Sequence, residues 1–182
     1  MNIFRCFGNT NMRGARTTFL CQAGLIEDAT TFAQRAAELA PDKTQALLLL
    51  AGIHTSKKRH AEAIDLYRKV ITINPSLADA YLYLGSPYGS QKRYAEAVET
   101  FRALEKMNPS SLMAPYYLGR IYAEQQKFPE ALAEFKRAAA LREDFEPAYT
   151  SMGLVYEVQG KPAEAIEAYK KKGKTYPVLV VA

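Results

Sequence analysis

The side chains of this sequence best suited to acid–base chemistry or metal binding are two cysteines, Cys6 and Cys21, and two histidines, His54 and His60. Catalysis requires a nucleophile, an acid–base pair or a metal ion within one pocket. Both cysteines lie near the amino terminus with no histidine beside them, so their spacing matches no zinc site. In an exported chain the two could form one disulfide bond, which is too few for a disulfide scaffold. We assign the cysteines no role.

The other chemistry-bearing features do not predict an enzyme. The sequence has no glycine-rich phosphate loop, no paired-metal spacing and no nucleophile elbow. His60 closes the basic run SKKRH at residues 56–60, which is more typical of a solvated turn between two helices than of a membrane or nucleic-acid contact. We therefore expect a non-enzymatic protein with no cofactor and no metal site, and we expect His60 to be in solvent.

A second set of side chains is suited to binding rather than to catalysis. Leu47 and Leu50 stand at helical spacing and suffice for one packed face of a helix. Leu48 and Leu49 add a second apolar strip that points elsewhere. The same surplus recurs at four later positions: Leu82, Tyr83, Tyr116 and Tyr117. A helix that is apolar on two sides needs cover on two sides.

The elements that carry these side chains repeat along the chain with a period of 34 residues. Prolines follow this period at Pro41, Pro75 and Pro109, and again two periods later at Pro177. Alanines keep the same step at Ala29, Ala63, Ala97, Ala131 and Ala165. Aromatic residues keep it at Tyr67, Phe101, Phe135 and Tyr169. A fixed period of this size indicates a repeat array, in which each unit covers an apolar face of its neighbour.

Each repeat is predicted to contain two helices, because its apolar residues recur every three or four positions, as at Tyr81, Leu84 and Tyr88. Polar residues after the prolines, or at the equivalent position of the next repeat, are expected to cap the first helices: Asp42, Ser76, Ser110 and Asp144. Pro129 and Pro162 stand where second helices should begin, a position that tolerates proline.

Three further expectations follow from the period. Pro87 falls inside a first helix, where we expect a kink or an early end. His54 is in phase with tyrosines of the later repeats, so we expect it to replace a core tyrosine rather than to act as a general base. Small residues stand where the two helices of a repeat cross, at Ala51, Gly85, Gly119 and Gly153. We expect the aromatic residue of the second helix to fill the space beside them.

The motifs within one period point to a known family. In one repeat LGRIY at residues 118–122 is followed by EALAEF at residues 130–135, and Asn-Pro steps end other repeats, as at residues 108–109. Together with the period, this combination resembles the tetratricopeptide repeat family over residues 44–177. The resemblance implies an all-α fold, a right-handed α-solenoid of helix-turn-helix repeats.

The predicted organisation begins with a poorly patterned segment, residues 1–20, and a degenerate half or full repeat, residues 21–43. Four tetratricopeptide repeats follow at residues 44–77, 78–111, 112–145 and 146–179, and residues 180–182 form a tail. The last repeat is degenerate at its end and has no polar closing helix, so we expect either self-association through this end or a further part of the chain downstream of it. The arginine-containing, acid-free start is either an organelle-targeting segment or a frayed or truncated end.

In the family that this chain resembles, first helices line a concave groove, and the surplus apolar positions face into it. The resemblance therefore implies a partner-binding groove formed by Leu48, Leu49, Leu82, Tyr83, Tyr116, Tyr117 and Arg120. Apolar and aromatic side chains suit an extended peptide or a partner helix. The alternative is that adjacent repeats bury these side chains against one another. The charged clamp by which some family members hold a carboxyl-terminal tail is absent, since its positions hold Leu48, Gly52, Tyr83 and Met113.

Composition and charge exclude other classes. The longest apolar run, residues 46–53, is far shorter than the roughly 20 residues that cross a bilayer, so we expect no membrane span. The net charge of +5 comes from the two ends, and the body of the chain is nearly neutral, without the basic stripe of a nucleic-acid-binding protein. We expect a cytoplasmic protein–protein interaction scaffold that binds a protein or a peptide. The alternative is the substrate-recruiting or regulatory portion of a larger, glycosyltransferase-like enzyme or assembly.

Overall fold

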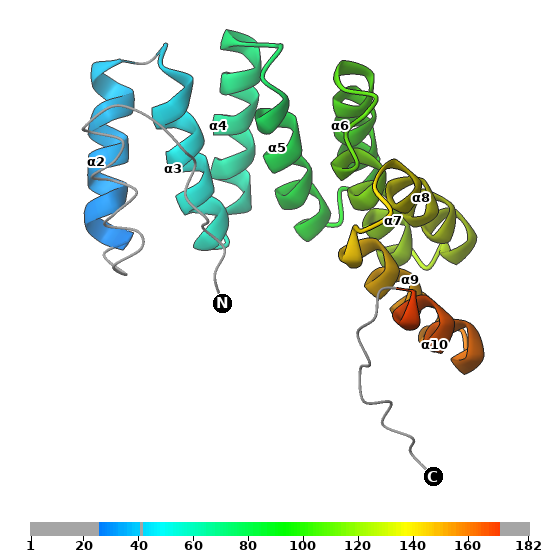
Figure 1. Cartoon of the computed structure of the whole chain (residues 1–182). Helices are drawn as coiled ribbons and strands as arrows, with labels where there is room; N and C mark the ends of the chain where they lie inside the picture. Colours follow the sequence, from blue (N-terminus) through cyan, green and yellow to red (C-terminus); the bar gives the residue numbers. More distant parts are fainter. Residues whose placement is uncertain (1–25, 41, 172–182) are drawn as a thin grey trace. The chain divides into compact units, whose positions relative to one another are not determined.

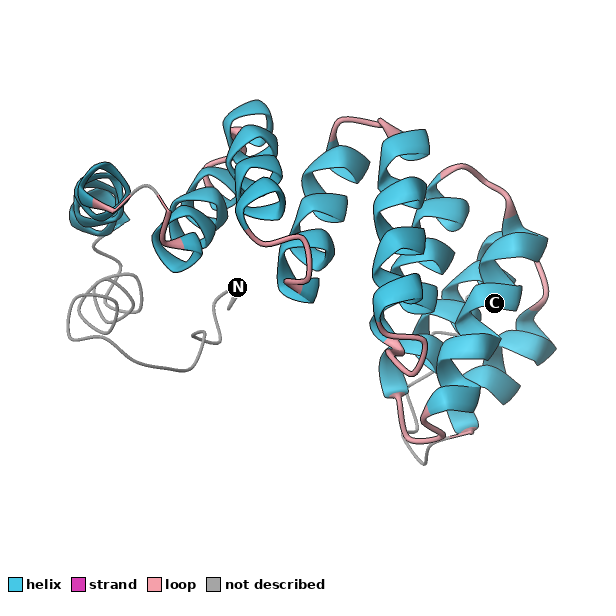
Figure 2. Cartoon of the chain, turned by 90° about the horizontal axis from the view of Figure 1, so that it is seen from above, coloured by secondary structure: helices cyan, strands magenta, loops and turns pink. Residues whose placement is uncertain are grey.

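The computed structural model describes residues 26–40 and 42–171, so Cys6, Cys21 and the predicted segments at 1–20 and 180–182 lie outside the described residues (Figure 1). Within the described ranges the chain consists of helices joined by short turns, with no strand (Figure 2). The helices are α2 (Ile26–Leu39), α3 (Thr44–Ser56), α4 (His60–Ile73), α5 (Ala78–Ser90), α6 (Tyr94–Met107), α7 (Met113–Glu124), α8 (Phe128–Leu141), α9 (Glu146–Val158) and α10 (Pro162–Lys170). The prediction of an all-α fold is confirmed, and the hand of the solenoid stays a prediction.

The helices fall into two units, one within residues 1–93 and one within residues 94–182. Unit 1 holds α2 to α5, and unit 2 holds α6 to α10. In each unit every helix packs against the helix before it in the sequence, and α3 also packs against α5, as α7 does against α9. Packing between near neighbours is what a repeat array predicts, because each repeat covers the next. The repeat boundaries themselves stay predictions.

The first helices of the repeats begin without the predicted side-chain caps. None of the residues that precede α3, α5, α7 and α9 makes a side-chain cap hydrogen bond: Lys43, Leu77, Leu112 and Phe145. The Ser76 hydroxyl instead donates a hydrogen bond of 2.8 Å to Oδ1 of Asn74. The Ser110 hydroxyl bonds Asn108 in the same way, also at 2.8 Å. The prediction was wrong for these serines because an asparagine two residues earlier engages each of them in a local turn.

Two of the prolines lie where they were predicted to begin helices, and a third, Pro87, differs from the prediction in part. Pro162 is the first residue of α10 and Pro129 is the second residue of α8, as predicted. Pro87 lies inside α5, and the helix continues to Ser90, so of the two predicted outcomes the early end is wrong and the kink stays a prediction. The ring of Pro87 is less than 2 % exposed. Its burial contributes hydrophobic free energy that offsets part of the cost of the missing amide hydrogen bond.

Each first helix ends in a turn that places one residue in the left-handed region. These residues are Lys58, Lys92, Gln126 and Gly160, with φ of 59°, 58°, 59° and 68°. In unit 2 the next amide, that of Lys127 or Lys161, donates a hydrogen bond of 2.9 Å to the carbonyl oxygen of Tyr122 or Tyr156. This bond closes the helix end in a Schellman-type motif. Glycine is the residue that this conformation favours, and it occurs at only one of the four positions.

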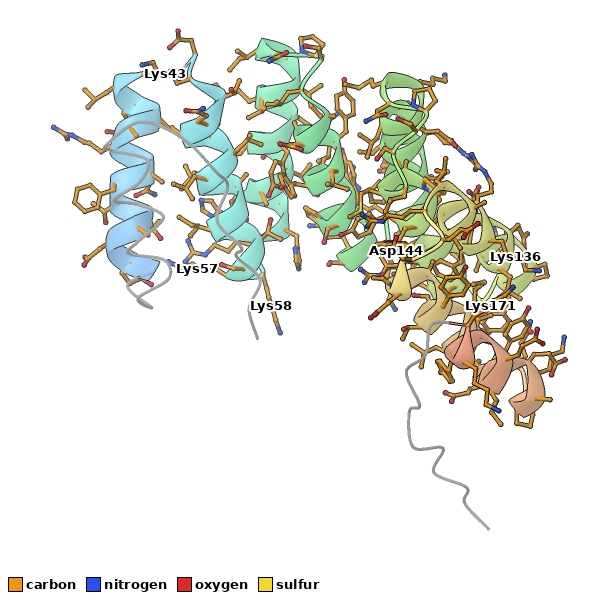
Figure 3. All side chains as sticks on the ribbon, in the orientation of Figure 1. Lys43, Lys57, Lys58, Lys136, Asp144 and Lys171 are labelled. Atoms are coloured by element: carbon orange, nitrogen blue, oxygen red, sulfur yellow. The ribbon has the colours of Figure 1, made fainter. Side chains whose placement is uncertain are left out.

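The basic run at residues 56–60 is only partly solvated. Nζ of Lys57 lies 3.0 Å from Oε1 of Glu27 and 3.2 Å from Oγ1 of Thr30, so this lysine ties the end of α3 to α2 (Figure 3). His60 begins α4 and is half-buried, and its Nδ1 has no hydrogen-bond partner among the described residues. The prediction that His60 is in solvent was therefore wrong in part, because the residue is half-buried and its Nδ1 atom is shielded from water.

His54 lies in the core of unit 1, as its phase predicted, with 9 % of the residue exposed. Its Nδ1 has no hydrogen-bond partner within the described part of the chain. Burial lowers the pKa of the His54 imidazole below its ordinary value, against the opposing effect of Glu62. This burial agrees with the prediction that His54 takes the place of a core tyrosine.

The predicted pairing of small and aromatic residues is confirmed in unit 2. A Cβ atom on Gly119 would lie 2.7 Å from the ring of Phe135, and one on Gly153 would lie closer still to the ring of Tyr169. Side chains larger than hydrogen therefore do not fit at either glycine without a shift of the ring. The aromatic residue of each second helix fixes how closely the first helix approaches it.

Candidate partner-binding surface

The seven predicted groove residues are divided between the two units. Leu48, Leu49, Leu82 and Tyr83 belong to unit 1, on α3 and α5, which pack against each other. Tyr116, Tyr117 and Arg120 belong to unit 2, on α7. The six apolar and aromatic residues are half-buried, and Arg120 is exposed.

In unit 1 the two leucines of α3 contact different parts of the core. Leu48 packs against a cluster that contains Leu47, Val70 and Ala80. Leu49 packs against a second cluster formed by Ala29, Ala33, Leu50 and Ile53. Neighbouring helices therefore cover part of each leucine, which supports the packing alternative for that part. The remainder of each side chain is accessible.

On α5 the tyrosine contributes to packing between successive helices. The ring of Tyr83 lies 6.2 Å from the ring of Tyr67 on α4, with the two planes at 34°. Burial raises the pKa of the Tyr67 phenol, against the opposing effect of a hydrogen bond with Thr55. Tyr83 itself is only half-buried, so part of its ring is accessible. We call the partly exposed set of Leu48, Leu49, Leu82 and Tyr83 the α3–α5 face.

In unit 2 Tyr116 belongs to the core rather than to an open surface. Its ring lies 5.1 Å from that of Phe145 and 6.0 Å from that of Phe135, and it packs against two buried clusters. Contacts on this scale are typical of a residue that holds adjacent repeats together. For Tyr116 the packing alternative is the better description.

Tyr117 is placed differently from its neighbour. Its ring stacks on Phe101 of α6 at a centroid distance of 5.2 Å and an interplanar angle of 8°. The guanidinium carbon of Arg120 lies 5.6 Å from the same ring, which is cation–π distance. Burial raises the pKa of the Tyr117 phenol, and Arg120 opposes this shift. One edge of a stacked ring is thus presented beside an exposed cation.

Two exposed apolar residues on α9 extend this surface and were not predicted. Leu154 is 53 % exposed and Val158 is 71 % exposed. Leu154 stands one period after Arg120, and α7 packs against α9, so the two occupy equivalent positions on adjacent helices. Pairs of adjacent surplus apolar residues mark the other predicted positions, whereas Leu154 is a single apolar residue at the position equivalent to Arg120 and gives no such signal. We call Tyr117, Arg120, Leu154 and Val158 the α7–α9 face.

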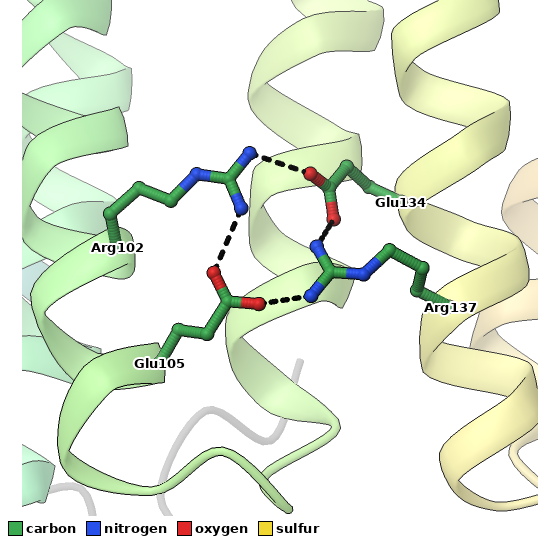
Figure 4. Close-up of polar contacts among 4 residues, drawn as sticks. All are labelled: Arg102, Glu105, Glu134 and Arg137. Carbon is green, nitrogen blue, oxygen red and sulfur yellow. Dashed lines mark hydrogen bonds and ion pairs between the residues drawn. The ribbon is translucent and has the colours of Figure 1, made fainter.

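A closed ring of ion pairs, also not predicted, joins the second helices of unit 2 (Figure 4). Arg102 of α6 donates to Glu105 on its own helix and to Glu134 of α8, both at 2.8 Å. Arg137 of α8 donates to Glu134 at 2.5 Å and also to Glu105. Each carboxylate therefore lies between two guanidinium groups.

The charges of the ring stabilise one another. Burial alone would raise the pKa of Glu105, but its hydrogen bonds to Arg102 and Arg137 hold that pKa below its ordinary value. The hydrogen bond to Glu105 likewise raises the pKa of each arginine. The side chain of Glu134 is 8 % exposed, so the ring is partly shielded from water. Its geometry serves to hold α6 and α8 side by side.

Metal-ligand clusters and membrane-crossing helices are both absent from the described ranges. No group of three or more histidine, cysteine, aspartate or glutamate side chains is arranged to hold a metal ion in that part of the chain. Among the same residues, no helix combines the length and the apolar character needed to cross a bilayer.

Family models match most of the described chain. Models described as "Tetratricopeptide repeat" match residues 77–144 and 146–171, which together are more than half of the sequence. This chain is a tetratricopeptide repeat protein. A further family model, "Anaphase-promoting complex, cyclosome, subunit 3", matches residues 22–103 of this chain. A comparison with curated proteins gave no match.

Solved structures share the fold of this tetratricopeptide repeat protein. MamA has a TM-score of 0.74 at 22 % identity, over 90 % of this chain and 94 % of MamA. TTC0263, a thermophilic tetratricopeptide repeat protein of Thermus thermophilus, has a TM-score of 0.73 at 22 % identity, over 86 % of each chain. YrrB, described as having an unusual peptide-binding site, has a TM-score of 0.63 at 20 % identity, over 85 % of this chain and 80 % of YrrB. At these identities the likeness concerns the fold.

Proposed function

We propose that this tetratricopeptide repeat protein is a protein-interaction scaffold and that the α7–α9 face binds a peptide segment of its partner. The observation that carries the proposal is the exposure of Leu154 and Val158, one helical turn apart, on the helix beside Tyr117 and Arg120. Exposed apolar side chains that cluster beside polar ones mark interaction sites more often than singly scattered ones. The peptide-binding site described for YrrB, which shares the fold, agrees with this proposal.

The chemistry of the face indicates what the segment carries. Leu154 and Val158 offer aliphatic contact, and the edge of the Tyr117 ring offers aromatic contact together with a hydroxyl. Arg120 could hold one carboxylate of the segment. An apolar residue next to an acidic residue is the arrangement that complements these four side chains. The α3–α5 face of unit 1 offers a mainly aliphatic surface of its own.

Paired substitutions on α9 test the proposal. Leu154→Ser with Val158→Ser removes the aliphatic part of the face, and exposed positions of this kind change stability by roughly 0.5 kcal/mol or less. Affinity purification with mass spectrometry identifies proteins bound by the unaltered chain, and pull-down then compares the variants. We expect the double variant to lose the partner while far-UV circular dichroism is unchanged.

A matched control separates the face from general surface stickiness. Leu141 of α8 is 47 % exposed, similar to Leu154, but lies on a second helix. Leu141→Ser should leave capture unchanged. Retained capture by the double variant, or equal loss in Leu141→Ser, would contradict the proposal for this face.

A further inference from the structure

The ion-pair ring has a counterpart one period later in which both carboxylates are missing. The residues 34 positions after Arg102, Glu105, Glu134 and Arg137 are Lys136, Ala139, Ala168 and Lys171. Both positively charged positions are kept, as lysines, and both glutamates are replaced by alanine. On α6 and α8 these positions carry two arginines paired with two glutamates. On α8 and at the end of α10 the equivalent positions carry two lysines and neither glutamate.

These four residues line one cavity of about 750 Å³ formed by α8, α9 and α10. Its apolar wall includes Tyr149, Met152 and Tyr156 of α9. Ala139 and Ala168 line it, and their short side chains leave open part of the space that glutamate side chains at these positions would fill. We call this cavity the α8–α10 pocket.

The two lysines are available for a ligand. Lys136 and Lys171 are both exposed, and neither has an ion-pair partner within 4.0 Å among the residues that the structure describes. Figure 3 shows both on unit 2, and both line the same pocket. Lysine ammonium groups bind carboxylates through charge-assisted hydrogen bonds.

Three glutamates also line the pocket and restrict what can enter it. Glu143, Glu164 and Glu167 are exposed and occupy none of the positions equivalent to the ring carboxylates. Their charge disfavours a continuous polyanion such as a nucleic acid, because repulsion would act along its length. A ligand with two discrete carboxylates limits that repulsion, because each carboxylate can lie directly against one lysine.

We propose that the α8–α10 pocket binds an acidic peptide segment whose two carboxylates take the places that Glu105 and Glu134 occupy one repeat earlier. The carboxylates pair with Lys136 and Lys171 and complete a four-member ring like that of Figure 4. The aliphatic stems of the ligand then contact Met152 and the tyrosine rings of α9. The α8–α10 pocket shares no lining residue with the α7–α9 face.

The test uses the full chain and a defined probe. The probe is a fluorescein-labelled, alanine-based helical peptide of about 15 residues with one pair of glutamates four positions apart, which places their side chains side by side. A counterpart carries glutamine at both positions. Fluorescence anisotropy at low salt should give a Kd at least roughly tenfold lower for the glutamate peptide, and raised salt should weaken it. Equal affinity for the two peptides, or no binding of either, would overturn the proposal.

Variants assign the binding to the pocket. Ala139→Glu with Ala168→Glu fills the two carboxylate positions from within the chain, so binding should be lost while the melting temperature is kept or raised. Lys136→Gln with Lys171→Gln should also abolish binding and covers the case in which the glutamate variant does not fold. Lys161→Gln with Lys170→Gln removes the same charge from exposed positions outside the pocket and should bind normally.

Two results would show that the pocket is not the site. Unchanged binding in the Lys136→Gln, Lys171→Gln variant would do so, as would an equal loss in the control pair. Competition by single-stranded DNA as strong as that by unlabelled glutamate peptide would show a general attraction for anions and would likewise overturn the proposal.

Discussion

Gly119→Ala is expected to destabilise unit 2, although alanine is the better helix former. A Cβ atom at this position would lie 2.7 Å from two ring atoms of Phe135 and 3.1 Å from the backbone oxygen of Ala131. Phe135 is 1 % exposed, so its ring has no open space into which to turn. Overpacking of this kind costs about 1 to 3 kcal/mol, and replacing glycine within a helix returns about 1 kcal/mol. We expect a net loss of about 1 kcal/mol.

A double-mutant cycle assigns this loss to the ring. Urea denaturation of the full chain, followed by far-UV circular dichroism, is measured for Gly119→Ala, Phe135→Leu and the combination. Because leucine vacates the ring position, Gly119→Ala should cost at least about 1 kcal/mol less in the combination than alone. A stabilisation of about 1 kcal/mol by Gly119→Ala, or the same cost in both backgrounds, would refute the packing account.

Three further predictions can be measured by the same denaturation. Gln126→Gly should stabilise unit 2 by about 0.5 to 1 kcal/mol, because residue 126 has a left-handed φ that favours glycine. Gly160→Ala should destabilise unit 2 by about as much, for the same reason. A loss of stability in Gln126→Gly together with a gain in Gly160→Ala would contradict this. Glu105→Gln should cost about 1 kcal/mol or less at neutral pH, since the ring is partly solvated. The pKa of Glu105 is lower in the folded protein than in the unfolded chain. The stabilisation by Glu105 is therefore complete above the pKa that this glutamate has in the unfolded chain. The cost of Glu105→Gln should vanish as pH falls through the pKa of Glu105 in the folded protein. Ala131→Leu should cost about 1 to 3 kcal/mol at this fully buried position, and no loss would contradict its placement at the helix crossing.

The sequence predicted those parts of the fold that depend on a residue type repeated at one position. Gly119 and Phe135 recur with their equivalents in the neighbouring repeats, and the structure places them in contact. His54 was located by the same reasoning and is buried. Where a position tolerates several residue types, the period of 34 residues does not reveal the local conformation. The left-handed turn at Lys58, Lys92 and Gln126 is invisible in the composition, because only the equivalent Gly160 is the residue expected there.

The candidate surface was predicted less completely, for a reason of geometry. Tyr116 and Tyr117 look equivalent as adjacent surplus residues, but Tyr116 reaches the ring of Phe145 whereas Tyr117 stacks on Phe101 and meets Arg120. Which neighbour an adjacent residue meets depends on how the next helix packs, and the sequence alone does not give that packing angle. The ion-pair ring was not predicted for a related reason. Its arginines and glutamates on different helices stand 32 positions apart, so the period of 34 residues does not pair them.

Residues that stabilise the array and residues that could give it specificity follow opposite rules along the period. A stacking position buries the same face in every repeat, so the same residue type serves each time, as at Ala97 and Ala131, both fully buried. A position that faces solvent carries no such constraint, and a change there alters binding without unfolding the array. The step from Arg120 to Leu154, which are both exposed, is a change of this kind. In a repeat protein the departures from the period are therefore better guides to partner contacts than the matches, provided that the structure shows the departing side chains at an accessible surface.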